Sequence, residues 1–275
     1  MAQLVPHVAF LCNRSGSLGF FRGTIAAEEV RHLGYADVET ARRIHDAITT
    51  RDLLNDLLYL VVRERSTPLP ASLSFARECM KSILVDLLLD LRMGADGLPF
   101  FPTDGVPERL LAMAPSLPGL SRSNISGLWI SLGLQIDLQY GGKRAVAEAV
   151  FRADPTWARI GEVELRLSED PEHEALPFLL EATYVDGLSD QNRVRRSLLG
   201  DLFTRTVQGL PRLTMPRELV GALASSRILR QLAVNQSLMY PTLLSPGETY
   251  SLLQEVPAIK RCGVSVVVPA WWECR

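Results

Sequence analysis

The chain has 275 residues, a formal net charge of −2 and a sequence pI near 6.1. Hydrophobic residues make up 47% of it and charged residues 22%, which is typical of a globular protein with a large core. This charge balance excludes a general attraction to nucleic acid or to acidic membranes. Any such contact must therefore come from a local patch.

The four cysteines lie far apart and form no CxxC pair, which argues against a disulfide framework and a cysteine zinc site. The four histidines are scattered as well. The N-terminus lacks the basic region of a secretory signal, and the apolar stretch SILVDLLLDL is interrupted by Asp86 and Asp90. We therefore expect a cytoplasmic protein with no membrane partner, no metal and no cofactor.

The N-terminal part, residues 1–93, is predicted to be mainly helical. A short apolar strand, HVAF, precedes a polar loop. Asp37 is placed to cap a helix through residues 39–62, where apolar residues recur at helical spacing. After the break STPLP, a second amphipathic helix is predicted over residues 71–92.

Proline and glycine are frequent between residues 94 and 127, and this stretch is the predicted linker. Strands are expected after it, in LWISLGLQIDLQY at 128–140, GEVELRL at 161–167 and ALPFLLEATYV at 175–185. The turn SEDPEHE would join the last two as a hairpin. Residues 128–275 are therefore predicted to mix strands and helices, and the chain is assigned to the α+β class.

The C-terminal part contains the clearest local signature. Ser245 is placed as an N-cap and Glu248 as its capping-box partner, and Gly263 is placed as a left-handed C-cap. The strand GVSVVVP follows. The helices predicted in this part cover residues 190–208, 216–232 and 246–262.

No nucleotide-binding loop is recognisable, because GGKR at Gly141 lacks the upstream glycine spacing and the hydroxyl after the lysine. The stretch HVAFLCNRSGSLG places Ser17 in a pattern close to the small-x-Ser-x-Gly elbow of serine hydrolases. His173, the only late histidine, lies in a charged turn, so the partners of such a serine are not evident. A small serine hydrolase using Ser17 stays an alternative to a plain polar loop.

The helix predicted over residues 190–208 carries arginines around an apolar stripe. Arginine suits bidentate contact with phosphate, so this face is a candidate for contact with nucleic acid. A solvated face paired with nearby carboxylates is the alternative. The candidate residues are Arg193, Arg195, Arg196 and Arg205.

The segment SPGETYSLLQEVPAIKRCGVSVVVPAWW, at residues 245–272, resembles a region of bacterial SWI/SNF-type helicases. In the accessory segment before the two motor lobes of that family, a Tyr-x-x-Leu helix, a Gly-Val pair and Pro-x-Trp-Trp recur together. The stretch ARIGEVELRLSEDPEHEALPFLLEATYVDG is similar to the Arg-Leu hairpin of the same segment, although Pro177-Phe178-Leu179 replaces its tryptophan pattern. The helix FARECMKSILVDLLLDLR looks like its long amphipathic helix.

The resemblance implies a non-catalytic, helicase-associated accessory module that regulates a DNA translocase and docks to its ATPase motor. In that family the chain continues past the tryptophans into the ATPase, so a separately encoded motor subunit is the expected partner. Trp271 and Trp272 are the candidate docking residues, with packing on their own domain as the alternative. By analogy with that family, the expected biological role is in DNA repair or antiphage defence. A protein-protein scaffold without DNA contact is a further alternative.

Overall fold

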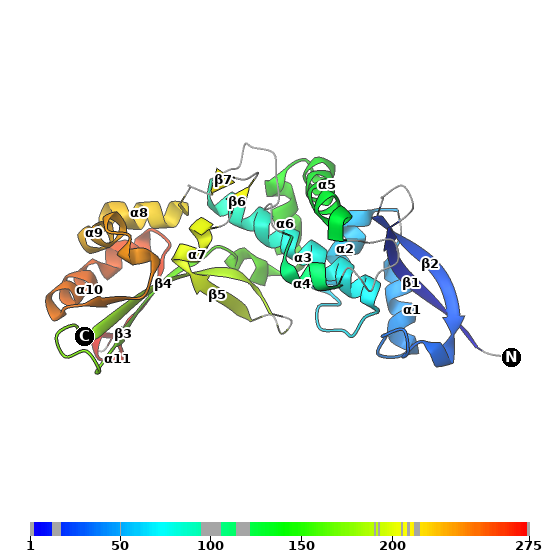
Figure 1. The fold of residues 1–275 in the computed structure, drawn as a ribbon, viewed down its shortest axis with the longest axis horizontal. Helices are drawn as coiled ribbons and strands as arrows, with labels where there is room; N and C mark the ends of the chain where they lie inside the picture. The colour runs from blue at the N-terminus through cyan, green and yellow to red at the C-terminus, as the bar shows by residue number, and fades with distance from the viewer. Residues whose placement is uncertain are drawn as a thin grey trace. The chain divides into compact units, whose positions relative to one another are not determined.

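The structure is a computed structural model in which the chain forms two compact units (Figure 1). Unit 1 is Met1–Leu87 with Leu98–Thr156, and unit 2 is Leu88–Gly97 with Trp157–Arg275. This division differs from the sequence-based one into 1–93, 94–127 and 128–275. Each unit contains helices and strands, so the α+β class is confirmed. The described residues are 3–12, 18–49, 51–94, 106–113, 122–189, 191, 193–204, 206–207, 210–211 and 215–273.

Unit 1 begins with an antiparallel hairpin, so the N-terminal part is not helical from its start. Strands β1 (Leu4–Cys12) and β2 (Leu18–Ala26) pair from Leu4↔Ala26 to Cys12↔Leu18. The hydroxyl of Tyr35 donates to the carbonyl of Val8 at 2.7 Å and accepts from its amide at 3.2 Å. Because these groups lie on the edge of β1, the tyrosine blocks that edge against pairing with another strand.

The helix predicted over residues 39–62 is two helices, α1 (Val38–Ala47) and α2 (Leu53–Val62). Asp37 caps α1, as predicted, by accepting from the amide of Thr40 at 2.7 Å. Asp52 caps α2 by accepting from the amides of Leu54 and Asn55, both at 3.2 Å. Apolar spacing continues across this break, which is why periodicity alone missed it.

The remaining helices of unit 1 include one correction. The strand predicted at 128–140 is wrong, because these residues belong to helix α5 (Arg122–Tyr140). Local alternation suggested a strand, but the buried side chains recur at spacings of four, three and four, as on one face of a helix. These side chains are Ile125, Trp129, Leu132 and Ile136. The other elements are η1 (Ala27–Glu29), α4 (Glu108–Met113), α6 (Lys143–Ala153) and α3 (Ala71–Arg92, as predicted), whose residues from Leu88 on belong to unit 2.

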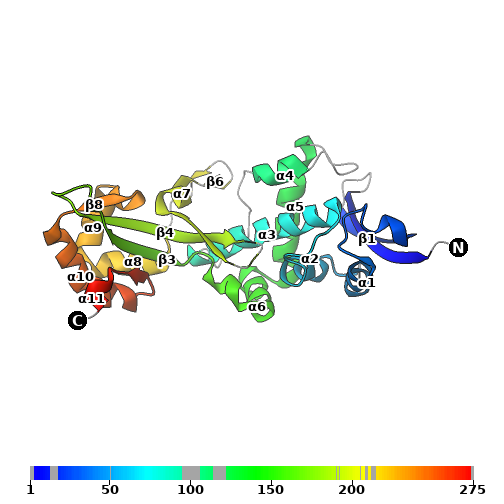
Figure 2. The ribbon, with the colours of Figure 1, turned by 90° about the horizontal axis from the view of Figure 1, so that it is seen from below.

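Unit 2 is built on a sheet with the strand order β5-β4-β3-β9, and β8 also pairs with β4. The predicted hairpin is confirmed: β3 and β4 are antiparallel from Val163↔Tyr184 to Glu169↔Phe178 (Figure 2). Strand β9 runs parallel to β3. Helices α8 and α9 lie on one side of this sheet (Figure 1). The strands are β3 (Val163–Glu169), β4 (Phe178–Leu188), β5 (Val194–Leu198), β8 (Thr242–Leu244) and β9 (Ser265–Val267).

Two of the helices predicted for unit 2 are corrected. Residues 194–198 of the expected 190–208 helix form strand β5, because they gain backbone partners along β4, from Thr183↔Leu198 to Leu188↔Val194. Ser226 divides the expected 216–232 helix, since its side chain caps a second helix by accepting from Leu229 N. The helical elements are η3 (Pro155–Arg159), α7 (Leu199–Thr204), α8 (Arg217–Ser225), α9 (Arg227–Val234) and η4 (Ser237–Met239). A short ladder, β6 (Thr206–Val207) with β7 (Leu210–Pro211), follows α7.

The last elements agree with the sequence signature. Helix α10 (Pro246–Arg261) begins with the predicted capping box: Ser245 Oγ accepts from Glu248 N at 3.3 Å, and the Glu248 carboxylate accepts from Ser245 N at 2.9 Å. Gly263 has a φ of 90°, which favours glycine and ends the helix as expected. Strand β9 and the short helix α11 (Ala270–Glu273) complete the unit.

Candidate docking site

Four aromatic side chains gather at the C-terminal end of unit 2. The Trp271 ring centroid lies 6.2 Å from that of Phe178 and 6.3 Å from that of Trp272. Trp272 in turn lies 6.3 Å from Tyr250, with the two rings nearly perpendicular. These separations are those of attractive aromatic pairs. We call Phe178, Tyr250, Trp271 and Trp272 the aromatic cluster.

Three elements position the cluster. Phe178 begins β4 and is paired in register with Leu244 of β8. Tyr250 lies in the second turn of α10. Pro269 follows β9 and cannot donate to a sheet ladder, and its carbonyl accepts from Trp272 N at 3.0 Å as α11 begins. The sequence therefore turns sharply after β9 and brings the two tryptophans back beside β4 and α10.

Trp271 keeps an exposed ring although it contacts its own unit. Its Nε1 donates to the carboxylate of Glu169 at the end of β3, so the polar atom of the indole is satisfied. The residue is nevertheless 44% exposed, whereas Trp129 and Trp157 are 2% and 1% exposed. Trp272 is half-buried. The tryptophans therefore pack on their own unit, and docking of Trp271 to a partner stays a prediction.

The turn between β3 and β4 begins at Glu169, which contacts Trp271, and carries further carboxylates. Glu169, Glu172 and Glu174 are exposed there. Asp170 accepts from Glu172 N at 3.1 Å and lies 3.1 Å from His173 Nδ1, so it holds the turn together. We call Glu169, Asp170, Glu172 and Glu174 the acidic turn.

The predicted arginine face lies on a strand and has carboxylate partners. Arg195 donates to Asp186 at 2.9 Å, and Arg196 donates to Glu164 at 2.8 Å. Both carboxylates are nearly buried, with side chains 11% and 9% exposed. Arg193 is exposed just before β5.

Arg205 lies outside the described residues, so its side chain adds nothing to this comparison. Because neighbours along a strand point to opposite faces, Arg195 and Arg196 do not form one basic surface. Of the described candidates, the structure therefore separates Arg196 from Arg195.

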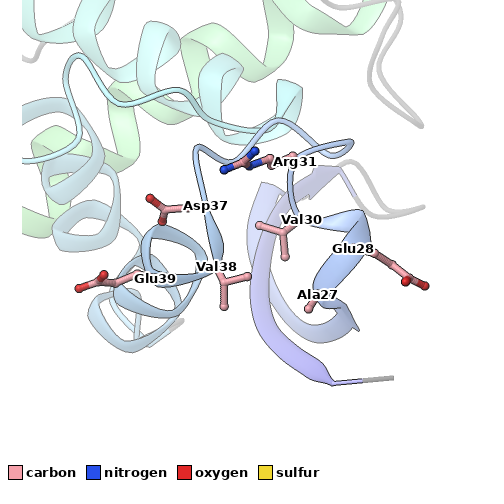
Figure 3. Close-up of a pocket in the computed structure, with 7 residues that line it drawn as sticks. All are labelled: Ala27, Glu28, Val30, Arg31, Asp37, Val38 and Glu39. Carbon is pink, nitrogen blue, oxygen red and sulfur yellow. The ribbon is translucent and has the colours of Figure 1, made fainter. Parts of the chain in front are cut away.

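Unit 1 contains a hollow of about 490 Å³ beside the start of α1 (Figure 3). Figure 3 shows Glu28 and Glu39 pointing to opposite sides of it. Asp37 is occupied as the helix cap, and hydrogen bonds from the amide and hydroxyl of Thr40 hold the pKa of this carboxyl below its usual value. Because Glu28 points away from Glu39 and Asp37 serves as the cap, these three carboxylates do not converge as a catalytic set would. Its lining residues are Ala27, Glu28, Val30, Arg31, Asp37, Val38 and Glu39.

The most perturbed titratable groups belong to the packing of unit 1. Burial, followed by a hydrogen bond to Glu64, raises the pKa of Tyr59 to about 12. Burial alone raises the pKa of the Cys79 thiol to about 12, which leaves it a poor nucleophile. Ser17, the hydrolase candidate, lies outside the described residues. Within the described ranges, no three His, Cys, Asp or Glu residues are grouped to hold a metal ion.

Sequence reasoning identified half of the aromatic cluster. Trp271 and Trp272 were expected, whereas Phe178 was noted only as a departure from a motif, and Tyr250 only as part of the Tyr-x-x-Leu helix. The contribution of Glu169 had no sequence signal, because it depends on the approach of α11 to the end of β3.

Comparison with known proteins gives no match: no family model, no curated protein and no solved structure matches this chain. In the described part of the chain, no helix has both the length and the apolar character needed to cross a membrane.

Proposed function

We propose that this chain is a non-catalytic accessory module of a bacterial, cytoplasmic SWI/SNF-type DNA translocase, and that it docks to the ATPase motor through the aromatic cluster. The observation that carries the proposal is the state of Trp271. The residue is 44% exposed, yet contacts with Glu169 and Phe178 orient its ring.

An indole presented in this way suits an anchor in a protein interface. Tryptophan is enriched among the few residues that carry most of the energy of such interfaces, because it buries a large apolar area. Contacts with Glu169 and Phe178 fix the ring before binding, so less conformational entropy is lost when a partner covers it. The docking motor subunit is the partner that the resemblance of residues 245–272 implies.

Contact with DNA is a separate part of the proposal, and the ion pairs limit which residues serve it. Arg196 is bonded to the buried Glu164, so its contact with a phosphate would leave that carboxylate without this partner. Arg193 is exposed and is the better placed candidate. We expect any DNA binding to be weak and to fall steeply with salt, because counterion release supplies most of its affinity.

The proposed function has two alternatives. A protein-protein scaffold would use the same cluster without DNA or a translocase. A serine hydrolase would use Ser17, and a specific loss of esterase activity in Ser17→Ala would support it. ATP turnover that stays with the chain through stringent purification would contradict a non-catalytic module.

Co-purification tests the docking proposal. The tagged chain is expressed together with a SWI/SNF-type motor from the same organism, and the retained motor is measured. We expect Trp271→Ala to reduce retention strongly. Tyr240→Ala, which truncates a 65% exposed aromatic outside the cluster, serves as the matched control and should retain the motor. Equal retention by all three proteins would contradict docking through the cluster.

A further inference from the structure

The parts of the chain nearest in sequence to the aromatic cluster contain several carboxylates and no lysine or arginine. The acidic turn contributes Glu169, Asp170, Glu172 and Glu174, and the start of α10 contributes Glu248. No lysine or arginine occurs in residues 167–180, 231–259 or 262–273, which form the turn, β8, most of α10, β9 and α11. Carboxylates therefore outnumber basic side chains in these ranges, which favours a basic partner over an acidic one.

The contact between Trp271 and Glu169 combines two recognition elements. The carboxylate meets the Nε1 edge of the indole, so the partly exposed ring has a negative group beside it. A cation above an indole ring is attracted by the ring electrons, and a carboxylate next to the ring adds a charge-assisted hydrogen bond. Guanidinium satisfies both, because it is planar, stacks on aromatic rings and donates from its edge.

We propose that the aromatic cluster and the acidic turn together receive a segment of a partner protein that carries arginine or lysine beside an apolar residue. The arginine or lysine stacks on Trp271, and neighbouring basic residues face Glu172 and Glu174. This inference rests on the proposed function in one respect: the motor subunit is taken to supply the segment.

The same charges exclude other occupants of this surface. A nucleic-acid backbone would bring phosphates toward the acidic turn, where like charges repel. An acidic peptide meets the same repulsion. An experiment distinguishes a second copy of this chain from a basic partner. Self-association through the cluster would occur without any partner and would depend on Trp271.

Selection of short random peptides displayed on phage, with the full chain as bait, tests the chemistry of the occupant. The selected peptides are synthesised, and their dissociation constants are measured by fluorescence anisotropy. Trp271→Ala removes the ring, and the double variant Glu172→Lys, Glu174→Lys reverses the turn. The double variant Glu28→Lys, Glu39→Lys makes the same change of charge at exposed residues of unit 1 and is the control.

We expect the selected peptides to be enriched in arginine or lysine. Trp271→Ala and the variant with the reversed turn should bind them about tenfold more weakly than the wild type does, and the control should bind them with wild-type affinity. Uncharged or acidic peptides, or an equal loss in the control, would overturn the proposal. So would Trp271-dependent self-association in sedimentation experiments. If basic peptides bind as described but no SWI/SNF-type motor is retained in co-purification, the proposed function fails and this inference stands.

Discussion

Glu255 in α10 accepts a hydrogen bond from the hydroxyl of Ser226, which lies 29 residues earlier in the chain and is fully buried. The same carboxylate accepts from the amide of Arg227 at 3.2 Å and from that of Ile228 at 3.4 Å. These amides belong to the first turn of α9, where no intrahelical acceptor exists. One side chain of α10 therefore caps α9 and fixes how the two helices pack within unit 2.

Glu255→Ala should lower the free energy of unfolding by about 2 kcal/mol, because it leaves the buried Ser226 hydroxyl and the amides of α9 without their charged acceptor. Urea denaturation measures the effect. Glu28→Ala, at an exposed glutamate of unit 1, should change stability by less than about 0.5 kcal/mol. A similar small effect for Glu255→Ala would show that the cap contributes little.

Gly161 and Arg92 form a second contact that is sensitive to one added carbon. Gly161 has a φ of 81°, and a Cβ there would lie 2.7 Å from Arg92 Cγ. The Arg92 guanidinium is held by the carbonyls of Ala158 and Ile160 and by Glu218, so it has little room to move.

Gly161→Ala should therefore destabilise the protein by about 2 to 4 kcal/mol, from backbone strain and overpacking together. Gly247→Ala is the control, because Gly247 lies in the first turn of α10 and an added Cβ there would meet only open space. That substitution should be neutral or slightly stabilising. Thermal unfolding compares the two, and equal melting temperatures would contradict this description of the contact.

The cap of α10 predicts a dependence of stability on pH. Hydrogen bonds from the hydroxyl and amide of Ser245 hold the pKa of Glu248 below its ordinary value of 4.5. A carboxyl with a lowered folded-state pKa stabilises the protein above its unfolded pKa, and this stability is lost as the pH falls through the folded pKa.

The difference in unfolding free energy between the wild type and Glu248→Gln should thus be constant near neutral pH and shrink below pH 4.5. Denaturation curves across this range give the measurement. A difference that stays constant into acid would mean that the charge of Glu248 does not act in the cap.

The arginines of β5 should separate into structural and surface residues. Arg196→Ala should cost about 1 to 3 kcal/mol, because the nearly buried Glu164 then keeps, among the described residues, Arg166 at 3.2 Å as its cationic partner. Arg193→Ala should leave stability unchanged, since the residue is exposed. If Arg193→Glu weakens DNA binding without unfolding the chain, Arg193 is a contact residue. If binding remains salt-sensitive but is unchanged in this variant, other residues make the contact.

Local signals in the sequence predicted those elements that depend on neighbouring residues. The capping box of Ser245 and Glu248 identified the start of α10, and the turn SEDPEHE between two expected strands identified the hairpin of β3 and β4. Two elements were assigned to the wrong class. Residues 194–198 form β5 because β4 offers backbone partners, and α5 is helical although a local window of it alternates.

The residues of the candidate site also differ in how far the sequence alone singles them out. Trp271 and Trp272 stand out in the sequence because two tryptophans follow a proline after a predicted strand. Their neighbours Phe178, Tyr250 and Glu169 come from segments 20 or more positions away and carry no common motif. Only the return of α11 toward β4 and α10 brings them together.

The dissociation constant for the SWI/SNF-type motor, measured by titration calorimetry with the wild type, Trp271→Ala and Tyr240→Ala, tests docking through the aromatic cluster most directly. We expect Trp271→Ala to bind at least about tenfold more weakly, as for an interface anchor, while its melting temperature stays close to that of the wild type. Tyr240→Ala should bind normally. Unchanged affinity in Trp271→Ala, or a loss of affinity matched by a loss of folding, would contradict docking through Trp271.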